Sequence, residues 1–322
     1  MQDNKEIAKE RTLQQFSHAL GESLIEFLHD DSVFEIMCNP DGTVWVDTFG
    51  QGFVDTGIVL PPERSKLIIQ SVAALSGQVI TKEIPALQAE IPDSHVCSSA
   101  RFQGELPHIV EAPSFNIRKH KDLNFSLKDY VNQGIMTEKQ YEYLMMAIKE
   151  QKNIIAAGGT KSGKTTLLNA ILQEISNSSD RIVMIEDTPE LRCNAKNNVS
   201  FRTTDTVDMD MLLRFTLRKS PNRIVVGEVR GREALTLLDA WSTGHRGGCS
   251  TVHSDSALDT LYRLESLVAR SSLTSQHETV GRAVDVIIYI KYTNGGRRSI
   301  EQIIEVDGYD VKNKEYKYRV IF

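Results

Sequence analysis

Residues 158–165 of this 322-residue chain read GGTKSGKT, which fits the pattern GxxxxGK[ST] of a phosphate-binding loop. The flanking sequence fits too, because a short apolar run (NIIAA) precedes the glycines and an apolar helical pattern (TTLLNAIL) follows them. Glycines let the backbone wrap a phosphate with its N–H groups turned inward, and the N-terminus of the next helix attracts the anion. These residues predict an ATP site in which Lys164 neutralises the β- and γ-phosphate oxygens and the hydroxyl of Thr165 binds Mg²⁺.

The loop and the start of its helix supply the residues expected to bind the nucleotide. They are Gly158, Gly159, Thr160, Lys161, Ser162, Gly163, Lys164, Thr165 and Thr166.

Hydrolysis also needs an acidic group on a neighbouring strand, and two segments offer one. The apolar run RIVV leads into Gly227 and Glu228, where a glutamate reaches far enough to orient the attacking water or act as its base. The segment 185–190 places Glu186, Asp187 and Glu190 past the carboxyl end of another strand, where open α/β sheets bind ligands. For Asp187, a helix cap and a role near the metal are equally compatible with the sequence.

His253 follows the strand-like segment CSTV at 249–252, and therefore lies on the same edge of a parallel sheet. An imidazole at that place could sense the γ-phosphate or polarise water. A single histidine at a strand end is more often structural, so this residue alone does not decide between the two roles.

From Thr137 onward helical and strand patterns alternate, which is typical of a parallel sheet with crossover helices. The expected helices are 138–151, 164–176, 208–219 and 232–243, and the expected strands are 153–157, 182–186, 223–228 and 249–252. The segment 284–322 reads as further strands with a hairpin near Gly295-Gly296.

The first part of the chain has a different pattern, typical of an α+β domain with antiparallel strands. We expect an amphipathic helix at 5–29, a hairpin around 39–42, a helix from Pro61-Pro62 to about Gly77, and strands near 87–91, 95–102 and 109–118. Helix 5–29 could contact a membrane or another subunit, but its apolar spacing favours packing in the core. The polar segment 119–137 is the expected linker between domains 1–118 and 138–322.

The overall composition narrows the function classes. Hydrophobic residues make up 40% and charged residues 25%, the net charge is −6, and the sequence pI is about 5.8. An acidic chain whose only dense basic patch is 118–121 is not expected to bind nucleic acid stably. We predict no secretory signal and no membrane span. The four cysteines form no CxxC pair, so buried free thiols in a reducing cytosol are expected instead of a disulfide or a metal site.

Taken together, the motifs resemble the secretion-ATPase superfamily, specifically its conjugal-transfer, type IV secretion branch (TrbB-like). Four elements occur in that family's order, namely the Walker A loop at 158–165, the Asp box at 185–190, the Walker B segment ending in GEVRG at 227–231, and the His box at 243–253. CNPDGTVWVD at 38–47 and APSFNIRK at 112–119 also look like TrbB-type sequence.

The resemblance implies a role for each matching residue. Glu228 corresponds to the catalytic glutamate and His253 to the His-box histidine, while Glu190 corresponds to the Asp-box residue near the Mg²⁺ and its water. Glu190 and Glu228 would act on the metal through water. Arg101 and Arg118 match arginines of the N-terminal domain that reach the nucleotide phosphates, where a guanidinium stabilises developing charge.

The same resemblance implies a PAS-like N-terminal domain and a RecA-like C-terminal domain. It further implies a homohexameric ATPase at the cytoplasmic face of the bacterial inner membrane, working with other type IV secretion components in conjugative pilus assembly or substrate transfer. Two residues depart from the family's pattern. Lys161 stands where Gly is usual, and at positive φ it would cost about 1 kcal/mol; Arg246 stands where Pro is common.

Three alternatives stay open at this point. One is a pilus or type II secretion ATPase, although the tetracysteine zinc module of the type II proteins is missing from the sequence. A P-loop kinase would need an acceptor-binding lid, which we do not identify. A nucleic-acid translocase is disfavoured by the acidic pI.

Overall fold

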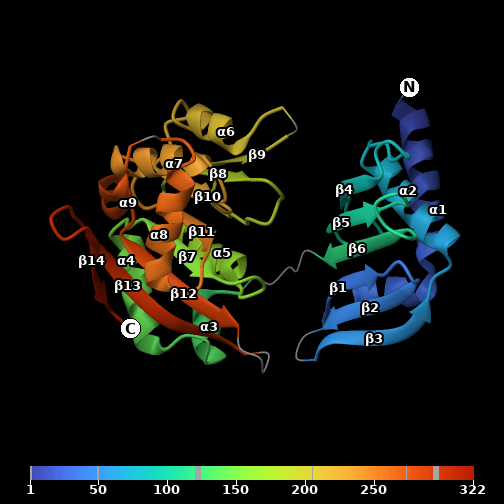
Figure 1. Ribbon diagram of the computed structural model, residues 1–322, viewed down its shortest axis with the longest axis horizontal. Helices are drawn as coiled ribbons and strands as arrows, with labels where there is room; N and C mark the ends of the chain where they lie inside the picture. The colour runs from blue at the N-terminus through green and yellow to red at the C-terminus, as the bar shows by residue number, and fades with distance from the viewer. Residues whose placement is uncertain (1, 49–50, 120–124, 205, 273, 293–296) are drawn as a thin grey trace. The chain divides into compact units, whose positions relative to one another are not determined.

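The computed structural model describes residues 2–48, 51–119, 125–204, 206–272, 274–292 and 297–322, with no side-chain description for 2–6 (Figure 1). The chain divides into two compact units, Met1–Asp122 and Leu123–Phe322, and each is described by itself.

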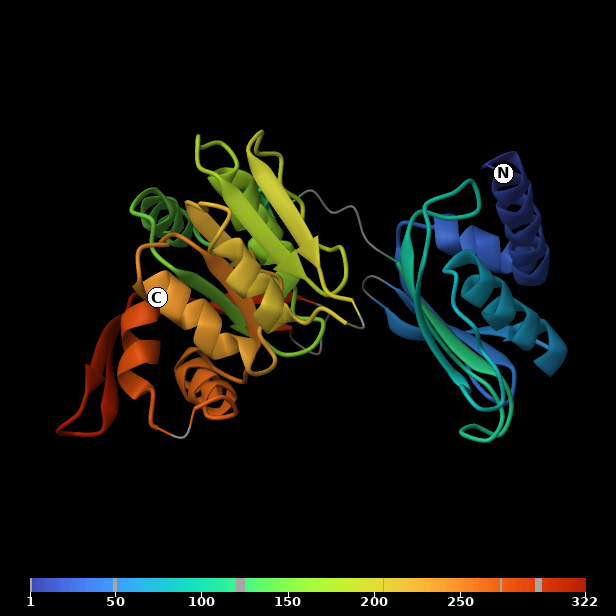
Figure 2. The same ribbon diagram turned by 90° about the horizontal axis from the view of Figure 1, so that it is seen from above.

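The first unit contains one antiparallel sheet of six strands in the order β3-β2-β1-β6-β5-β4. Two helices cover one of its faces (Figure 2). The elements are α1 (Gln2–His29), β1 (Val33–Cys38), β2 (Thr43–Thr48), β3 (Gly52–Val59), α2 (Pro62–Leu75), β4 (Ala86–Ile91), β5 (Ala100–Glu105) and β6 (Ser114–Lys119). The antiparallel α+β architecture expected from the sequence is confirmed.

Helix α1 packs into the core of this unit. Phe16, Leu20 and Leu24 are buried against the sheet and α2, as the apolar spacing predicts. The helix is interrupted at Gly21, and Arg64 of α2 donates to the carbonyl oxygens of Ala19 (2.6 Å) and Leu20 (2.9 Å) next to the interruption. These two bonds satisfy acceptors that the broken helix leaves without an internal partner.

The second unit is a doubly wound α/β layer with an eight-stranded sheet in the order β14-β13-β12-β7-β11-β10-β8-β9. Strands β12, β7, β11, β10, β8 and β9 run parallel, whereas β13 and β14 add an antiparallel edge. The strands are β7 (Ile154–Gly158), β8 (Ile182–Glu186), β9 (Asn198–Arg202), β10 (Arg223–Val226), β11 (Cys249–His253), β12 (Val286–Tyr292), β13 (Arg298–Asp310) and β14 (Glu315–Val320).

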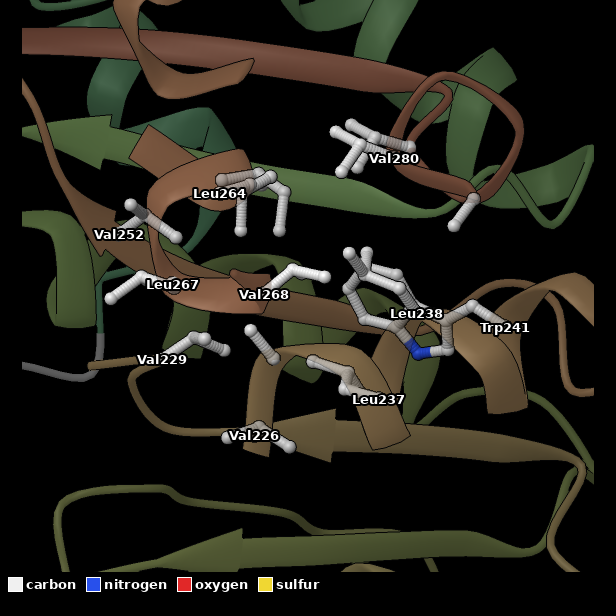
Figure 3. Packing of buried hydrophobic residues seen from close by; sticks show 14 of the residues in the cluster. Val226, Val229, Leu237, Leu238, Trp241, Val252, Leu264, Leu267, Val268 and Val280 are labelled. Atoms are coloured by element: carbon white, nitrogen blue, oxygen red, sulfur yellow. The ribbon is translucent and has the colours of Figure 1, made fainter. Parts of the chain in front are cut away.

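Helices cover both faces of this sheet, as a parallel sheet buried on two sides requires. One core packs beneath α3 (Leu127–Asn132), α4 (Glu138–Lys149) and α5 (Lys164–Ile175). The other packs beneath α6 (Met209–Thr216), α7 (Glu233–Ser242), α8 (Ala257–Val268) and α9 (His277–Ala283). Figure 3 shows part of this second core, where Trp241 of α7 lies beside Leu238 and Val280.

Most of the expected elements occur, with a few differences. The segment 119–137, expected to be a polar linker, contains α3, whose Leu127 and Tyr130 are buried because they supply an apolar face to the second unit. β5 and β6 begin about five residues later than expected, since the segment between them holds Leu106-Pro107 and ends at Pro113 outside the strands. β3, β9, α8 and α9 were not predicted. The hairpin expected near Gly295-Gly296 lies outside the described residues.

Cys38, Cys97 and Cys249 are buried free thiols, as expected, whereas Cys193 is half-buried. Within the described ranges, no helix is long and apolar enough to cross a bilayer.

Candidate active site

The strand order brings the four sequence motifs to one edge of the second sheet. β7, β11, β10 and β8 are consecutive neighbours and all run parallel. The segments that follow their carboxyl ends therefore lie side by side: the glycine-rich loop after β7, His253 at the end of β11, Glu228 after β10, and the Asp-box loop after β8. This edge is where a doubly wound sheet binds its ligands.

The glycine-rich loop has the backbone that a phosphate cradle needs. A Cβ on Gly158 would collide with the carbonyl oxygen of Ile290 and lie 2.6 Å from Ser162 Oγ, so the loop can turn here only with glycine. Gly163 has φ 99° and directly precedes the first residue of α5, Lys164. The loop thus delivers its backbone N–H groups and a helix N-terminus to the same point.

Lys161 adopts φ 62°, a left-handed conformation that side chains with a Cβ rarely take. The positive φ anticipated at this position is therefore present. Arg298, the first residue of β13, donates from Nη2 to the carbonyl oxygen of Lys161 at 3.4 Å, and its guanidinium lies 5.2 Å from the centre of the Tyr292 ring. The hydrogen bond supports the strained turn from outside the loop, and the ring of Tyr292 helps to place the guanidinium.

Four side chains form a continuous line across the sheet edge. Lys164 Nζ donates to the carbonyl oxygen of Gly159 (2.7 Å) and lies 3.2 Å from His253 Nδ1. On the other side of the imidazole, His253 Nε2 lies 3.1 Å from Glu228 Oε1. The second carboxylate oxygen, Oε2, accepts a hydrogen bond from Arg230 Nη2. The imidazole thus lies between the loop lysine and the Walker B glutamate, close to Glu228 Oε1 but not hydrogen-bonded to it.

This line fixes the tautomer of His253. Lys164 Nζ can only donate, so Nδ1 must accept and Nε2 carries the proton toward the Glu228 carboxylate. The pKa of His253 is lowered, first by partial burial and next by the charge of Lys164, while Glu228 acts in the opposite direction. The neutral imidazole is therefore the favoured state at neutral pH.

The Asp-box loop is held by a buried carboxylate. Glu186, the last residue of β8, is 4% exposed and accepts from the backbone N–H groups of Glu190 (2.7 Å) and Leu191 (2.8 Å) through Oε2. Burial raises the pKa of Glu186, and the two N–H bonds oppose that change. Glu186 therefore holds the loop from inside. The other two carboxylates of the segment, Asp187 and Glu190, lie at the surface of the loop.

Asp187 accepts from Thr203 Oγ1 (2.9 Å) and lies 3.8 Å from Arg230 Nη1, so it is not a helix cap. It borders a hollow of about 390 Å³ beside Glu228 that is lined by acidic and basic groups, among them Asp208, Arg230 and Arg232.

The glycine-rich loop fits a bound triphosphate. Gly158 has no Cβ that would obstruct the tight turn of the backbone, and Lys164 places a positive charge beside the loop. Among the described residues, no group of three or more His, Cys, Asp or Glu could hold a metal ion.

Residues 22–294 match the Type II/IV secretion system protein family. The chain belongs to that family. It is 43% identical over 309 residues to the conjugal transfer protein TrbB of Rhizobium radiobacter, an alignment that covers 95% of this chain and 93% of the relative. It is 31% identical over 291 residues to the type IV secretion system protein VirB11 of Bartonella quintana, covering 78% and 80%.

Among solved structures, the ATPase DotB of Legionella pneumophila is similar in fold, with a TM-score of 0.62 at 20% identity over 86% of this chain and 77% of that one. The resemblance of the sequence to the secretion family is thus confirmed.

In this secretion-family member, the two arginines expected to reach the phosphates are cross-strand partners in the first unit. Arg101 of β5 pairs with Arg118 of β6, and the row continues outward to Glu90 on β4 and Glu35 on β1. The row lies on the sheet face opposite to the buried Phe102 and Ile117. Two like charges directly opposite one another destabilise a sheet, and the carboxylates of Glu35 and Glu90 at the ends of the row offset this effect. The reach of the two arginines to the phosphates stays a prediction.

The structure brings Lys164, His253 and Glu228 together, as expected for one site. Thr165 and Thr166 lie half-buried in the first turn of α5, and Glu190 lies half-buried on its loop. Three further residues were missed. Arg230 is two positions from Glu228, a spacing that could have suggested the pair. Asn169 follows Thr165 by one helical turn, and it holds the Asp-box loop. Arg298 has no local signal, because the sheet alone brings it to residue 161.

Proposed function

We propose that this chain is the ATP-hydrolysing motor of a type IV secretion system and that it works in conjugation. Its membership in the secretion family and the names of its relatives support the assignment to a type IV secretion system. The observation that carries the ATPase assignment is the line Lys164–His253–Glu228, which joins a phosphate-binding lysine to an acidic group suited to activate water.

ATP binding falls to the loop and to the start of α5. Lys164 exchanges its bond to the Gly159 carbonyl for the β- and γ-phosphate oxygens, and the backbone N–H groups from Gly159 to Lys164 surround the anion. The Thr165 hydroxyl, together with waters held by Glu190 and Glu228, would bind Mg²⁺. The metal supplies charge stabilisation as the bond to the γ-phosphate breaks.

Glu228 orients the attacking water and accepts its proton. The guanidinium of Arg230 holds Oε2 of Glu228, whereas Oε1 lies 3.1 Å from His253 Nε2 and accepts no hydrogen bond from the described residues, which leaves it open to the water. His253 also lies beside Lys164, so a change at the γ-phosphate is transmitted through one imidazole to the glutamate. Arg101 and Arg118 add positive charge for the transition state.

The working form is proposed to be a homohexamer at the cytoplasmic face of the bacterial inner membrane, associated there with other type IV secretion components. The domains are proposed as 1–118 and 138–322, with α3 of the connecting segment packed on the second, so that ATP turnover moves one against the other. Light scattering tests the assembly: a mass about six times 36.1 kDa in ATP and Mg²⁺ supports the ring, and a monomer under all conditions contradicts it.

The catalytic assignment is tested by two substitutions with matched controls. Lys164→Ala should abolish binding of a fluorescent ATP analogue, whereas Lys149→Ala, at the exposed end of α4, should not. Glu228→Gln should bind the analogue but lower kcat about 100-fold or more, as expected for loss of a general base. Glu315→Gln, at the exposed start of β14, is its control. Normal phosphate release by Glu228→Gln would remove Glu228 from the mechanism.

A further inference from the structure

The side chain of Asn169 joins α5 to the Asp-box loop through two hydrogen bonds. Its Nδ2 donates to the carbonyl oxygen of Glu190 at 2.8 Å, and its Oδ1 accepts from the backbone N–H of Arg192 at 3.0 Å. The carboxamide therefore holds the main chain on both sides of Leu191.

Helix geometry links these bonds to the P-loop. Asn169 follows Thr165 by four residues in α5, so the two side chains lie on one face of the helix, one turn apart. A helix is rigid over a single turn. Through Asn169, the segment carrying Glu190 is thus fixed to the same helix that carries Thr165.

Side-chain contacts keep the conformation of this loop, and two of them act at Glu190 and its neighbours. Residues 187–197 form neither helix nor strand, so their backbone groups need partners outside a regular ladder. Glu186 supplies one anchor by accepting from the N–H groups of Glu190 and Leu191. Asn169 supplies a second anchor at residues 190–192, and it comes from the middle of the nucleotide-binding helix. Farther along the loop, Cys193 Sγ lies 3.4 Å from Ser176 Oγ and Ala195 is buried.

We infer that Asn169 is a positioning residue that holds Glu190 at a fixed distance from Thr165. The inference rests on the proposed function, in which both residues act at the Mg²⁺ of bound ATP. It explains why the position needs a carboxamide, since aspartate cannot donate to the Glu190 carbonyl and alanine makes neither bond. A purely helical role predicts the opposite, because alanine is the better helix former.

The first test measures the loop without relying on activity. In the full chain, hydrogen exchange by mass spectrometry should be faster in peptides covering 187–193 for Asn169→Ala than for the wild type. The control is Asn177→Ala, an exposed asparagine just past the end of α5, which should leave those peptides unchanged. Unchanged exchange in Asn169→Ala would overturn the inference whatever the protein's function.

The second test measures catalysis. We expect Asn169→Ala and the isosteric Asn169→Asp to lower kcat by about 10- to 100-fold, the usual effect of losing an outer partner of a metal site. The Mg²⁺ concentration needed for half-maximal activity should rise, while binding of an ATP analogue without Mg²⁺ should stay the same. A loss of Mg²⁺-free binding would mean that Asn169 acts on the P-loop itself, and would overturn the inference.

A double-mutant cycle with Glu190→Gln separates this inference from the proposed function. If Asn169 acts through Glu190, the Asn169→Ala substitution should have little further effect in the Glu190→Gln protein. The inference would be overturned if the losses of the two substitutions were additive. It would also be overturned if Asn169→Ala had normal turnover while Glu190→Gln was impaired. Either result would leave the role of Glu190 intact. Normal turnover of Glu190→Gln would refute both.

Discussion

Gly248 offers a severe test of the packing that positions His253. It precedes β11, and it lies against α7, where Trp241 Nε1 donates to the carbonyl oxygen of Ile224 at 3.2 Å. A Cβ added to Gly248 would come within 3.0 Å of both members of that bond, a separation that real Cβ atoms essentially never show. Gly248→Ala must therefore displace Trp241, which is 1% exposed in the core shown in Figure 3.

The cost has two parts. Moving a large side chain in a close-packed core costs about 1–3 kcal/mol. Breaking a buried bond so that the indole N–H or the Ile224 carbonyl loses its partner costs about 1–3 kcal/mol more. The free energy of unfolding of the second unit should fall by about 2–6 kcal/mol, a large part of the usual 5–15 kcal/mol of a domain. For a unit of this size, Tm should fall by roughly 5–20 °C.

The chain has two tryptophans, so fluorescence can isolate the second unit. In a Trp45→Phe background, urea or thermal unfolding followed by fluorescence reports on Trp241 alone. The control is Gly244→Ala, where a Cβ meets nothing within 4 Å but φ is +112°, so only backbone strain of about 1–2 kcal/mol applies. A Gly248→Ala protein at least as stable as the Gly244→Ala protein would refute the steric argument.

Three further outcomes are expected. First, the pKa of His253 is lowered from 6.5 in the folded protein, so on acidification the unfolded chain binds a proton before the folded chain does. The free energy of unfolding should therefore fall as pH drops below about 6.5. His253→Asn should flatten this part of the plot of unfolding free energy against pH, and an unchanged plot would contradict the burial argument. Second, Lys161→Gly relieves about 1–2 kcal/mol of strain but loses about 0.4–1 kcal/mol through a freer unfolded chain. Its stability should rise by about 0–1.6 kcal/mol in urea unfolding, and its affinity for an ATP analogue should depend less on salt; a clear destabilisation would contradict the strain. Third, Arg118→Gln removes the like charge opposite Arg101 and also the opposite charge beside Glu35. The two effects oppose one another, so the stability of the first unit should change by less than about 1 kcal/mol, while phosphate release slows; normal release would remove the arginine from catalysis.

The sequence predicted the elements whose signals are local. The glycine loop, the helix after it and the apolar strands were found because each is marked by periodicity or by glycine chemistry within a few residues. Glu228 and His253 could be named because each ends such a strand. Their neighbour relationship could not be derived from the residues alone, since it depends on β11 lying between β7 and β10.

The missed features depend on tertiary contacts. α3 was missed because a helix of six residues is too short to show a helical period among the polar residues around it, and the core of the second unit decides that Leu127 and Tyr130 pack. Arg298 reaches the turn at Lys161 only through the pairing of β13 with β12. Asn169 looks like an ordinary polar residue in a helix until the Asp-box loop is in place. No pattern of spacing encodes such contacts.

The position of β11 also constrains when the site can form during synthesis. β7 ends at Gly158, but both of its partners, β11 and β12, begin much later in the chain, at Cys249 and Val286. Until those segments emerge from the ribosome, the phosphate-binding loop follows a fully apolar strand that has no neighbour on either side. Such unpaired strands expose a growing chain to aggregation. A fragment that stops before residue 249 would thus contain the whole phosphate-binding loop and Glu228, yet lack the strand that brings them into one site.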